Sequence, residues 1–383
     1  MHEEITKEFI SFLESDKYLK ELVKKSLKKA KMINPDKNTN PAQSLRRLYE
    51  FLDWSAKCLP WQCLKGVEYP SLYKRIDQCI GYFWFIFDQP LQELENMGYY
   101  YPSLQYVQPI ASWIKKYSKA WGEFLSSPES WNQEFCQLFL QDENFNLKSG
   151  IYEERQWSSF NDFFARKLKS DKVRQIAEAD VVSPADSYPK GFYKIDKYGD
   201  LINTSVIVKS ANFKSIRDLI GADSQYNDKF ASGTLTHTFL DINDYHRYHF
   251  PVSGTIKEMR KIPAANACGG ITEWNQEEHC YQYLYEIGFQ MIETRDCVIV
   301  ETEKFGLVAI LPIGMSQICS CNFEKGLKVG MKVKKGDPLG FFLFGGSDIV
   351  MIFQECANVI DLTKNSIGKD GHILMGQAYA DIK

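Results

Sequence analysis

The chain has 383 residues, 44% of them hydrophobic and 14% aromatic, which is enough apolar material for two domains with sizeable cores. Its formal net charge of −3 argues against a nucleic-acid partner, and no glycine-rich loop ending in Lys-Ser or Lys-Thr suggests a nucleotide-phosphate site. The ten cysteines are scattered, with only Cys319 and Cys321 close together, which favours reduced thiols and argues against a metal site.

The start of the chain and its most apolar run indicate the cellular compartment of the protein. The first 30 residues are charged throughout and lack the unbroken apolar region of a signal peptide. The run 339–353 is too short to cross a bilayer and is interrupted by Gly345, Gly346 and Asp348. We therefore expect a cytoplasmic protein.

The first part of the chain has the periodicity of amphipathic helices, and Asp16 is a candidate N-cap for the second of them. Pro- and Gly-bearing loops separate the later stretches. We predict a helical N-terminal accessory domain over residues 1–145. Its apolar positions begin with Ile5, Phe9, Phe12, Leu13, Leu19, Leu22, Val23 and Leu27, and further helices are expected over 43–58, 71–88, 104–125 and 128–140.

A lysine-rich stretch between Lys20 and Lys31 flanks one of these apolar stripes. The favoured interpretation is a helix that packs on the core and exposes its lysines to water. The alternative is peripheral contact with an anionic membrane surface, for which the same pattern is suited.

Beyond about residue 155 the pattern changes to short apolar strands with glycine or proline between them. No helical stretches of 10–15 residues alternate with these strands, which argues against a parallel sheet. We predict an α+β protein whose residues 146–383 form an antiparallel, β-rich catalytic domain. The clearest strands are expected over 234–240, 297–302, 307–313 and 348–353.

One turn permits unusual chemistry. In Gly345-Gly346-Ser347, a serine follows glycines that allow backbone conformations other residues avoid. Given a base, the Ser347 hydroxyl can attack the carbonyl of Gly346 and convert the peptide bond to an ester. Elimination then releases the upstream chain, and hydrolysis of the dehydroalanine that remains gives a pyruvoyl group.

Such a reaction requires a base and a group that orients it. His246 and His249 lie three residues apart, and Asp186 lies in a separate segment from which it could hold a histidine in one tautomer. From spacing alone, the alternatives are structural histidines and an aspartate that caps a turn.

Three motifs together resemble the phosphatidylserine decarboxylase family: SPAD (183–186), DYHRYHFP (244–251) and FGGSD (344–348). They correspond to the family's Pro-x-Asp motif, its histidine motif and its Gly-Ser cleavage site. The resemblance extends over roughly residues 155 to 360 and is also carried by FNDFFARKL (160–168), PIGMSQICS (312–320) and GMKVKKGDPLGFF (330–342).

The resemblance implies self-cleavage between Gly346 and Ser347, by a triad in which His249 is the base and Asp186 orients it. Ser347 would become the pyruvoyl cofactor at the start of a small chain, 347–383, that stays with the large one. The ketone would form a Schiff base with the substrate amine and accept the electrons left by carbon dioxide. His246 would help the decarboxylation step as a general acid.

Two departures leave the substrate open. Asp348 stands where the family has Thr or Ser, and the chain lacks the N-terminal membrane anchor of bacterial and mitochondrial members. WGEFLSSPESW (121–131) is similar to a soluble branch that includes fungal tryptophan decarboxylases. The substrate is therefore either phosphatidylserine or a free L-amino acid, with aromatic ones among the candidates.

The alternative hypothesis is that the protein is not an enzyme. The run GMKVKKGDPLG (330–340) is similar to the turn of lipoyl and biotinyl carrier domains, so the chain could be a carrier or an inactive scaffold. We also expect the protein to form a homo-oligomer.

Overall fold

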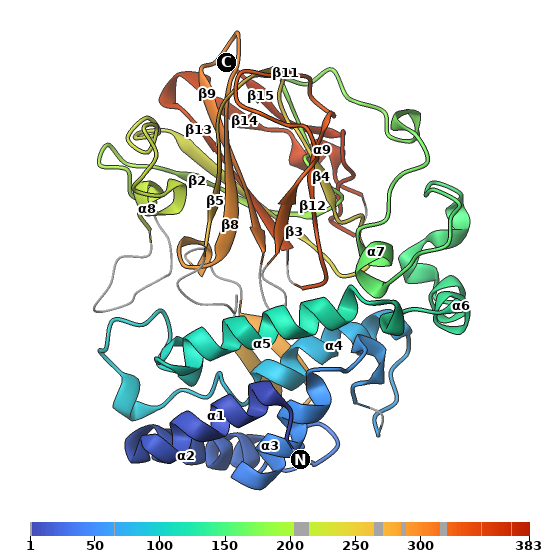
Figure 1. Ribbon diagram of the computed structural model, residues 1–383. Coiled ribbons are helices and arrows are strands. Elements are labelled where there is room, and N and C mark those ends of the chain that lie inside the picture. The colour runs from blue at the N-terminus through green and yellow to red at the C-terminus, as the bar shows by residue number, and fades with distance from the viewer. Residues whose placement is uncertain are drawn as a thin grey trace.

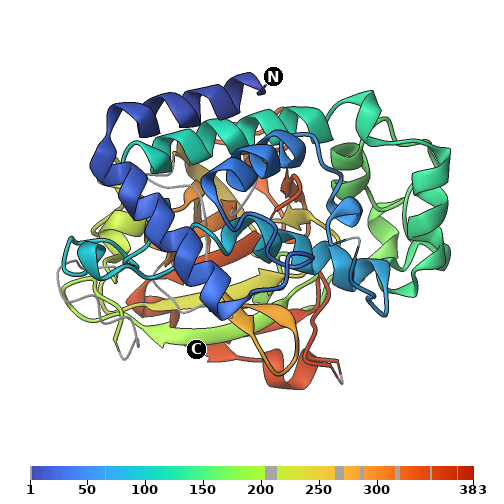
Figure 2. The ribbon, with the colours of Figure 1, turned by 90° about the horizontal axis from the view of Figure 1, so that it is seen from below.

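The computed structural model describes residues 2–64, 66–202, 214–263, 271–284, 289–314, 320–345, 347–368 and 370–383. A helical region formed by the first part of the chain lies below a β-rich region, as Figure 1 shows. Seen from below, the helices α1 to α5 lie in front of the sheets (Figure 2). The α+β prediction is confirmed.

The helices of the N-terminal region begin at polar caps where the sequence provides them. Asp16 accepts a hydrogen bond from the Leu19 amide, and Ser44, Ser71 and Asn132 cap three further helices in the same way. The helix expected from residue 104 begins only after Pro109, which has no amide hydrogen to continue a preceding helix. These helices are α1 (Glu4–Ser15), α2 (Lys17–Ile33), α3 (Leu45–Ser55), α4 (Leu72–Trp84), α5 (Ile110–Leu125) and α6 (Gln133–Gln141).

Short helices occur in the connections and in the β-rich region. They comprise α7 (Phe160–Phe164), α8 (Ile216–Ile220), α9 (Thr363–Ser366), and the 3-10 helices η1 (Pro60–Gln62), η2 (Gln92–Leu94), η3 (Leu104–Tyr106), η4 (Pro128–Ser130), η5 (Glu143–Phe145), η6 (Leu147–Ser149), η7 (Asp171–Val173), η8 (Phe289–Met291) and η9 (Glu355–Ala357).

The lysine-rich helix α2 packs on the core. Its apolar stripe, which includes Leu22 and Leu27, is buried. Lys25 pairs with Glu93, and Lys29 donates to the carbonyl of Pro90, which ties its polar face to the neighbouring loop. This burial favours the core interpretation, because the apolar stripe is covered by protein. No helix among the described residues is long and apolar enough to cross a membrane.

Antiparallel ladders form every sheet in the described part of the chain. The main sheet has the order β11-β5-β8-β9-β13-β3-β2, and smaller sheets have the orders β1-β15-β14, β10-β12-β4 and β6-β7. The strands are β1 (Val181–Val182), β2 (Tyr188–Lys194), β3 (Thr234–Leu240), β4 (Arg247–His249), β5 (Gly254–Ile262), β6 (Ile271–Asn275), β7 (Cys280–Leu284), β8 (Thr294–Glu301), β9 (Leu307–Gly314), β10 (Cys321–Phe323), β11 (Lys332–Val333), β12 (Pro338–Phe342), β13 (Ser347–Phe353), β14 (Val359–Asp361) and β15 (Ala378–Ile382).

Strand β13 lies inside the main sheet and is buried on both faces. Ile349 and Met351 face the core that also contains β4, β12 and β15. Val350 and Ile352 face the core covered by α8. Burial on both faces explains the uninterrupted apolar run of this strand, since a half-exposed strand would alternate with polar residues.

The hairpin β6–β7 leaves the other strands and packs in the helical region, behind α4 and α5 in Figure 1. Gln78 donates to the carbonyl of Tyr281 at 3.0 Å, and the amide of Gly81 donates to the hydroxyl of Tyr283 at 2.9 Å. A Cβ at Gly81 would lie 2.5 Å from Tyr281, so only glycine permits this close approach. The boundary at residue 145 stays a prediction, since this later segment shares the helical core.

Candidate functional site

Ser347 is the first residue of β13 and pairs with Leu240 of β3 and Gly314 of β9. Its side chain is fully buried, and its Oγ has no hydrogen-bond partner among the described residues. Gly346 lies outside them. Gly345 has a φ of 147°, a conformation that favours glycine.

The chain passes from one core to another at this point. Phe344 is fully buried against Phe160, Phe164 and Trp121 of the helical region. Its amide donates to the Asn161 Oδ1 at 3.0 Å. Phe344 is therefore fixed to the helical core, and the residues from Ser347 onward are fixed in the main sheet.

His246 lies just before β4 and is fully buried. Its Nδ1 lies 3.0 Å from the carbonyl oxygen of Asp244, which can only accept, so Nδ1 carries the proton. Nε2 has no partner in the described structure, and the ring stacks on Phe164 with centroids 3.8 Å apart. Burial, reinforced by the charge of Arg166, holds the pKa of His246 well below its ordinary value.

His249 has both ring nitrogens engaged. Nδ1 donates to the carbonyl of Gly336 at 2.8 Å, and Nε2 lies 3.2 Å from the hydroxyl of Tyr245. Burial lowers the pKa of His249, so this imidazole is neutral and its Nε2 can accept a proton.

Asp186 lies near the histidine motif but is hydrogen-bonded elsewhere. Its carboxylate accepts from Arg174 and, at 2.8 Å, from the amide of Met375. The two motifs are joined through the backbone, because the amide of His249 donates to the carbonyl of Pro184 at 2.8 Å. No hydrogen bond joins Asp186, His249 and Ser347 to one another among the described contacts, so their predicted roles stay predictions.

Other buried residues around the histidines had no assigned role in the sequence analysis. Arg166 donates to the carbonyls of Asn243 and Asp244 at 2.8 and 2.9 Å. The Asp244 carboxylate lies 2.8 Å from the Nε2 of His372. Arg166 and Asp244 lie within two of the family motifs, and this position in the sequence could have indicated that they belong to the site. His372 lies outside those motifs.

Asp348, which directly follows Ser347 and departs from the family pattern, is buried and lies 2.7 Å from the Nε2 of His237. Gln290 donates to the same carboxylate oxygen at 3.1 Å. Successive side chains on a strand point to opposite faces, so this carboxylate lies on the other side of the sheet from the Ser347 hydroxyl.

A cavity of about 730 Å³ opens between α5 and the ends of β5 and β8. Ser347, Gly314 and Thr294 occupy one row across the main sheet, with their side-chain positions on the same face. Thr294 lines the cavity and lies two strands from Ser347, a separation of about 10 Å at the usual strand spacing. The backbone of Ser320, which also lines the cavity, packs directly on Gly314.

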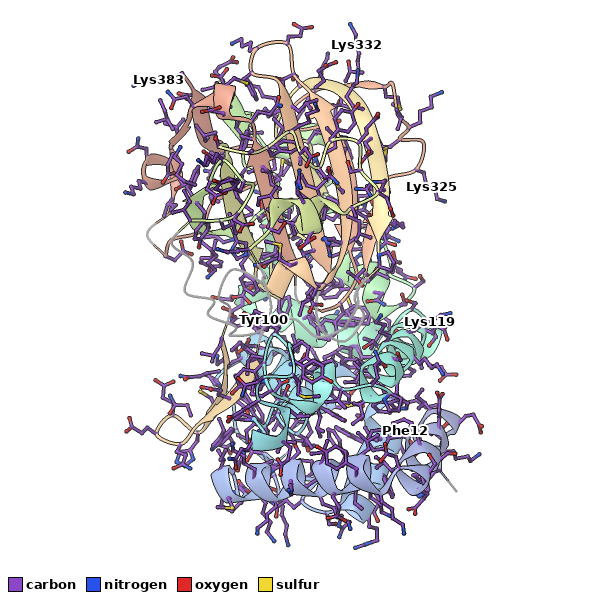
Figure 3. All side chains as sticks on the ribbon, turned by 90° about the vertical axis from the view of Figure 1, so that its left-hand side faces the viewer. Phe12, Tyr100, Lys119, Lys325, Lys332 and Lys383 are labelled. Carbon is purple, nitrogen blue, oxygen red and sulfur yellow. The ribbon has the colours of Figure 1, made fainter. Side chains whose placement is uncertain are left out.

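Basic side chains outnumber acidic ones around this cavity. Lys119, on α5, lies just below the sheets in Figure 3. Lys261 pairs with Asp296 at 3.3 Å, and Lys119 lies 3.9 Å from Glu123. The basic lining consists of Lys115, Lys119 and Lys261, whereas the Arg295 guanidinium donates to carbonyls of Leu219, Glu293 and Asp218 on the other face of the sheet.

The described ranges contain no group of His, Cys, Asp or Glu side chains that could hold a metal ion. Cys321 is buried with its thiol near the carbonyl of Pro312, whereas Cys319 lies outside those ranges. The structure therefore does not describe Cys319 and Cys321 together.

Comparison with known proteins gives one consistent result. A family model described as phosphatidylserine decarboxylase matches residues 160–381. The chain is 30% identical over 284 residues to a phosphatidylserine decarboxylase proenzyme of Fusobacterium nucleatum subsp. nucleatum, covering 70% of this chain and 85% of the relative. Proenzymes of the same name from Chlamydia caviae (29%, covering 65% of this chain and 79% of the relative) and Clostridium perfringens (27%, 74% and 94%) are also similar.

The match covers the segments that bring the three motifs together, from α7 to β15. It also agrees with the antiparallel β-rich fold that holds Ser347 at the start of a central strand. The chain belongs to the phosphatidylserine decarboxylase family and is a carboxy-lyase of that family.

Proposed function

We propose that the chain cleaves itself between Gly346 and Ser347 and then decarboxylates phosphatidylserine to phosphatidylethanolamine. The observation that carries the proposal is the Ser347 hydroxyl, fully buried and without a described partner, at the junction between two cores. A buried hydroxyl without a hydrogen bond is costly to stability, which supports a chemical role for it.

Self-cleavage requires only groups of this chain and water. The Ser347 Oγ gives its proton to a base and attacks the Gly346 carbonyl carbon, and the bond from that carbon to the Ser347 nitrogen breaks. Loss of the Ser347 Cα proton then expels the Gly346 carboxylate. Water finally converts the dehydroalanine to a pyruvoyl group and releases ammonia.

The two histidines are proposed to act in different reactions, self-cleavage and decarboxylation. His249 is proposed as the base, because it is neutral and its Nε2 can accept a proton. His246 is proposed to serve the decarboxylation step, because its Nε2 is buried without a described partner. Asp186 is proposed to act on His249 through its negative charge, which favours the protonated imidazole.

A pyruvoyl ketone supplies an electron sink for the electrons released with carbon dioxide. The site fits such a group, since Ser347 is shielded from water and lies beside aromatic and apolar side chains. The residues of β13 hold it in the sheet, and the small chain 347–383 stays bound through the ladders of β13 with β3 and β9 and of β15 with β1.

The cavity near Thr294 supports a phospholipid substrate. The phosphatidylserine head group carries two negative charges and one positive charge, which suits a lining with more basic than acidic side chains. Its phosphorus lies four bonds from the amine, a reach of about 5 Å at ordinary bond lengths. This reach is about half of the roughly 10 Å between Ser347 and Thr294, so a head group held at Ser347 would place its phosphate between Ser347 and the cavity.

The alternative substrate is a free amino acid, which the segment 121–131 suggested at the level of sequence. In the structure, Trp121 and Trp131 pack in the helical core, where Trp121 contacts Phe344 and Trp131 stacks on Phe163. The segment therefore gives no support to an aromatic binding site. Cytoplasmic location and a homo-oligomeric state stay predictions.

Cleavage is tested on the purified chain by denaturing electrophoresis and intact mass. We expect a small chain of about 4 kDa, at roughly 110 Da per residue, without a free amino terminus. Ser347→Ala should stay uncleaved and His249→Ala should cleave very slowly. A wild-type chain that stays full length on long incubation would overturn the proposal.

Substrate choice is tested separately by carbon dioxide release. Cleaved enzyme is given phosphatidylserine in detergent micelles, phosphoserine, serine, tryptophan or tyrosine at equal concentration. We expect release from phosphatidylserine and little from the free amino acids. Release from tryptophan alone would replace the lipid by the second candidate and leave the cleavage mechanism intact.

A further inference from the structure

We propose that His372 is a positioning residue that acts through Asp244 to hold His246 in its working orientation. The inference rests on the proposed function, in which His246 serves decarboxylation. It assigns part of the active-site support to the segment downstream of the cleavage bond, which becomes the small chain.

The contact between the two chains is direct and largely shielded from water. The His372 Nε2 lies 2.8 Å from the Asp244 Oδ1, with the two side chains 16% and 8% exposed. The His372 ring also packs edge-on against Tyr188, with centroids 4.8 Å apart. The same downstream segment donates the Met375 amide to Asp186, so it contacts both acidic residues near the histidines.

Asp244 is the residue through which this contact reaches His246. Its second carboxylate oxygen accepts from the amide of Asp241 at 2.8 Å, and its own amide donates to the Asp241 carbonyl at 3.0 Å. The turn 241–244 is thereby closed at both ends. The main-chain carbonyl of Asp244, which this turn fixes, accepts the Nδ1 hydrogen of His246.

The consequence for His246 is a fixed tautomer. With the proton on Nδ1, Nε2 is the nitrogen left to exchange a proton with the reacting atoms. Arg166 braces the same carbonyl with a second hydrogen bond. His372 supports the same turn through the Asp244 carboxylate, so its loss should tilt the carbonyl and with it the imidazole.

The charges around the pair agree with this role. Burial raises the pKa of Asp244 to about 6, and the hydrogen bond from His372 opposes that rise. For His372, burial acts to lower the pKa, but the hydrogen bond and the charge of Asp244 outweigh it and raise the pKa. The carboxylates of Asp186 and Asp370 also favour the protonated imidazole. The raised pKa of His372 favours a protonated imidazole facing the Asp244 carboxylate.

The test compares kcat and KM of cleaved enzyme on phosphatidylserine in detergent micelles. His372→Ala should still cleave, because His249 is untouched, but its kcat should fall about 10- to 100-fold with KM within twofold of wild type. His372→Gln, which keeps an N–H donor, should recover most of the loss. His279→Asn, on the exposed turn between β6 and β7, is the matched control and should match wild type.

A double-mutant cycle shows whether His372 acts through Asp244. The kcat of His372→Ala/Asp244→Ala should be no lower than that of Asp244→Ala alone, because each change removes the contact between His372 and the Asp244 carboxylate. Fully multiplicative losses, or a His372→Ala enzyme with unchanged kcat, would overturn the inference. If His372→Ala does not fold, the same cycle with His372→Phe, which fills the space of the ring without an N–H donor, decides the question. Failure of wild type to cleave or release carbon dioxide would instead refute the proposed function.

Discussion

At the scale of single residues, the carboxylate beside the cleavage serine has a structural partner. Asp348 and His237 form a buried pair across two neighbouring strands, and Gln290 adds a hydrogen bond. The pair faces the core under α8, whereas Ser347 faces the opposite core. A carboxylate at this position is therefore accommodated by a histidine on β3, away from the Ser347 hydroxyl.

Asp348→Ala should separate stability from processing. It leaves His237 buried without its carboxylate, so the free energy of unfolding should fall by about 1–3 kcal/mol. Urea unfolding in the uncleavable Ser347→Ala background measures this on a single chain. With Ser347 present, cleavage should proceed at close to the wild-type rate, because the lost side chain lies on the far face of the sheet.

The His237→Ala/Asp348→Ala pair provides the control for that experiment. If the two residues stabilise the fold through each other, the double variant should lose less stability than the sum of the single variants. Arrested cleavage in Asp348→Ala, with the fold intact, would contradict the assignment of Asp348 to a purely structural pair.

At the scale of elements, the hairpin β6–β7 connects the β-rich region to the helices. Tyr281 inserts among the helical core residues and donates its hydroxyl to the carbonyl of Thr39. The amide of Thr272 donates to Asp88 at 2.8 Å. The hairpin therefore uses polar contacts from both of its strands as well as an aromatic anchor.

Gly81→Ala tests how tightly this hairpin is docked. In an open helix, replacing glycine by alanine stabilises by about 1 kcal/mol. Here the new Cβ would lie 2.5 Å from Tyr281, so overpacking should instead destabilise by about 1–3 kcal/mol. Thermal unfolding gives the sign directly. A higher melting temperature than wild type would show that the hairpin can move away from α4.

The strands with long apolar runs could be predicted from sequence, and β3 occupies the expected residues 234–240. The hairpin β6–β7 could not, because its half-exposed strands hold Glu, Gln and Asn and are stabilised by contacts with distant helices. The expected helix over 128–140 is divided because Pro128 begins a short 3-10 helix and Asn132 caps the next.

At the scale of the whole molecule, the proposed cleavage site follows Phe344 of the helical core and directly precedes a strand of the main sheet. Motifs in the sequence predicted that Asp186, the histidines and Ser347 belong to one site. They could not predict that Asp186 bonds to Arg174 and Met375, since both contacts depend on how distant segments pack. The contact of His372 could not be predicted either, because its partner Asp244 lies 128 residues away in the sequence.

Fixing the chain on both sides of the bond should matter for the rate of self-cleavage. Phe344 holds the upstream side in the helical core, and an attack on the Gly346 carbonyl requires this segment to be held in place. Phe344→Leu should slow cleavage about tenfold or more, measured as the decay of full-length chain after cell-free synthesis. It should also lower the free energy of unfolding by about 1–1.5 kcal/mol.

Phe9→Leu is the matched control for the loss of stability expected in Phe344→Leu. Phe9 is fully buried in the same helical core and packs on Trp113, away from the contacts of Phe344. The two variants should lose similar stability, but only Phe344→Leu should cleave slowly. Equal cleavage rates in both would show that the helical core stabilises the chain without positioning the bond, and the strand β13 alone would then have to hold Ser347 for attack.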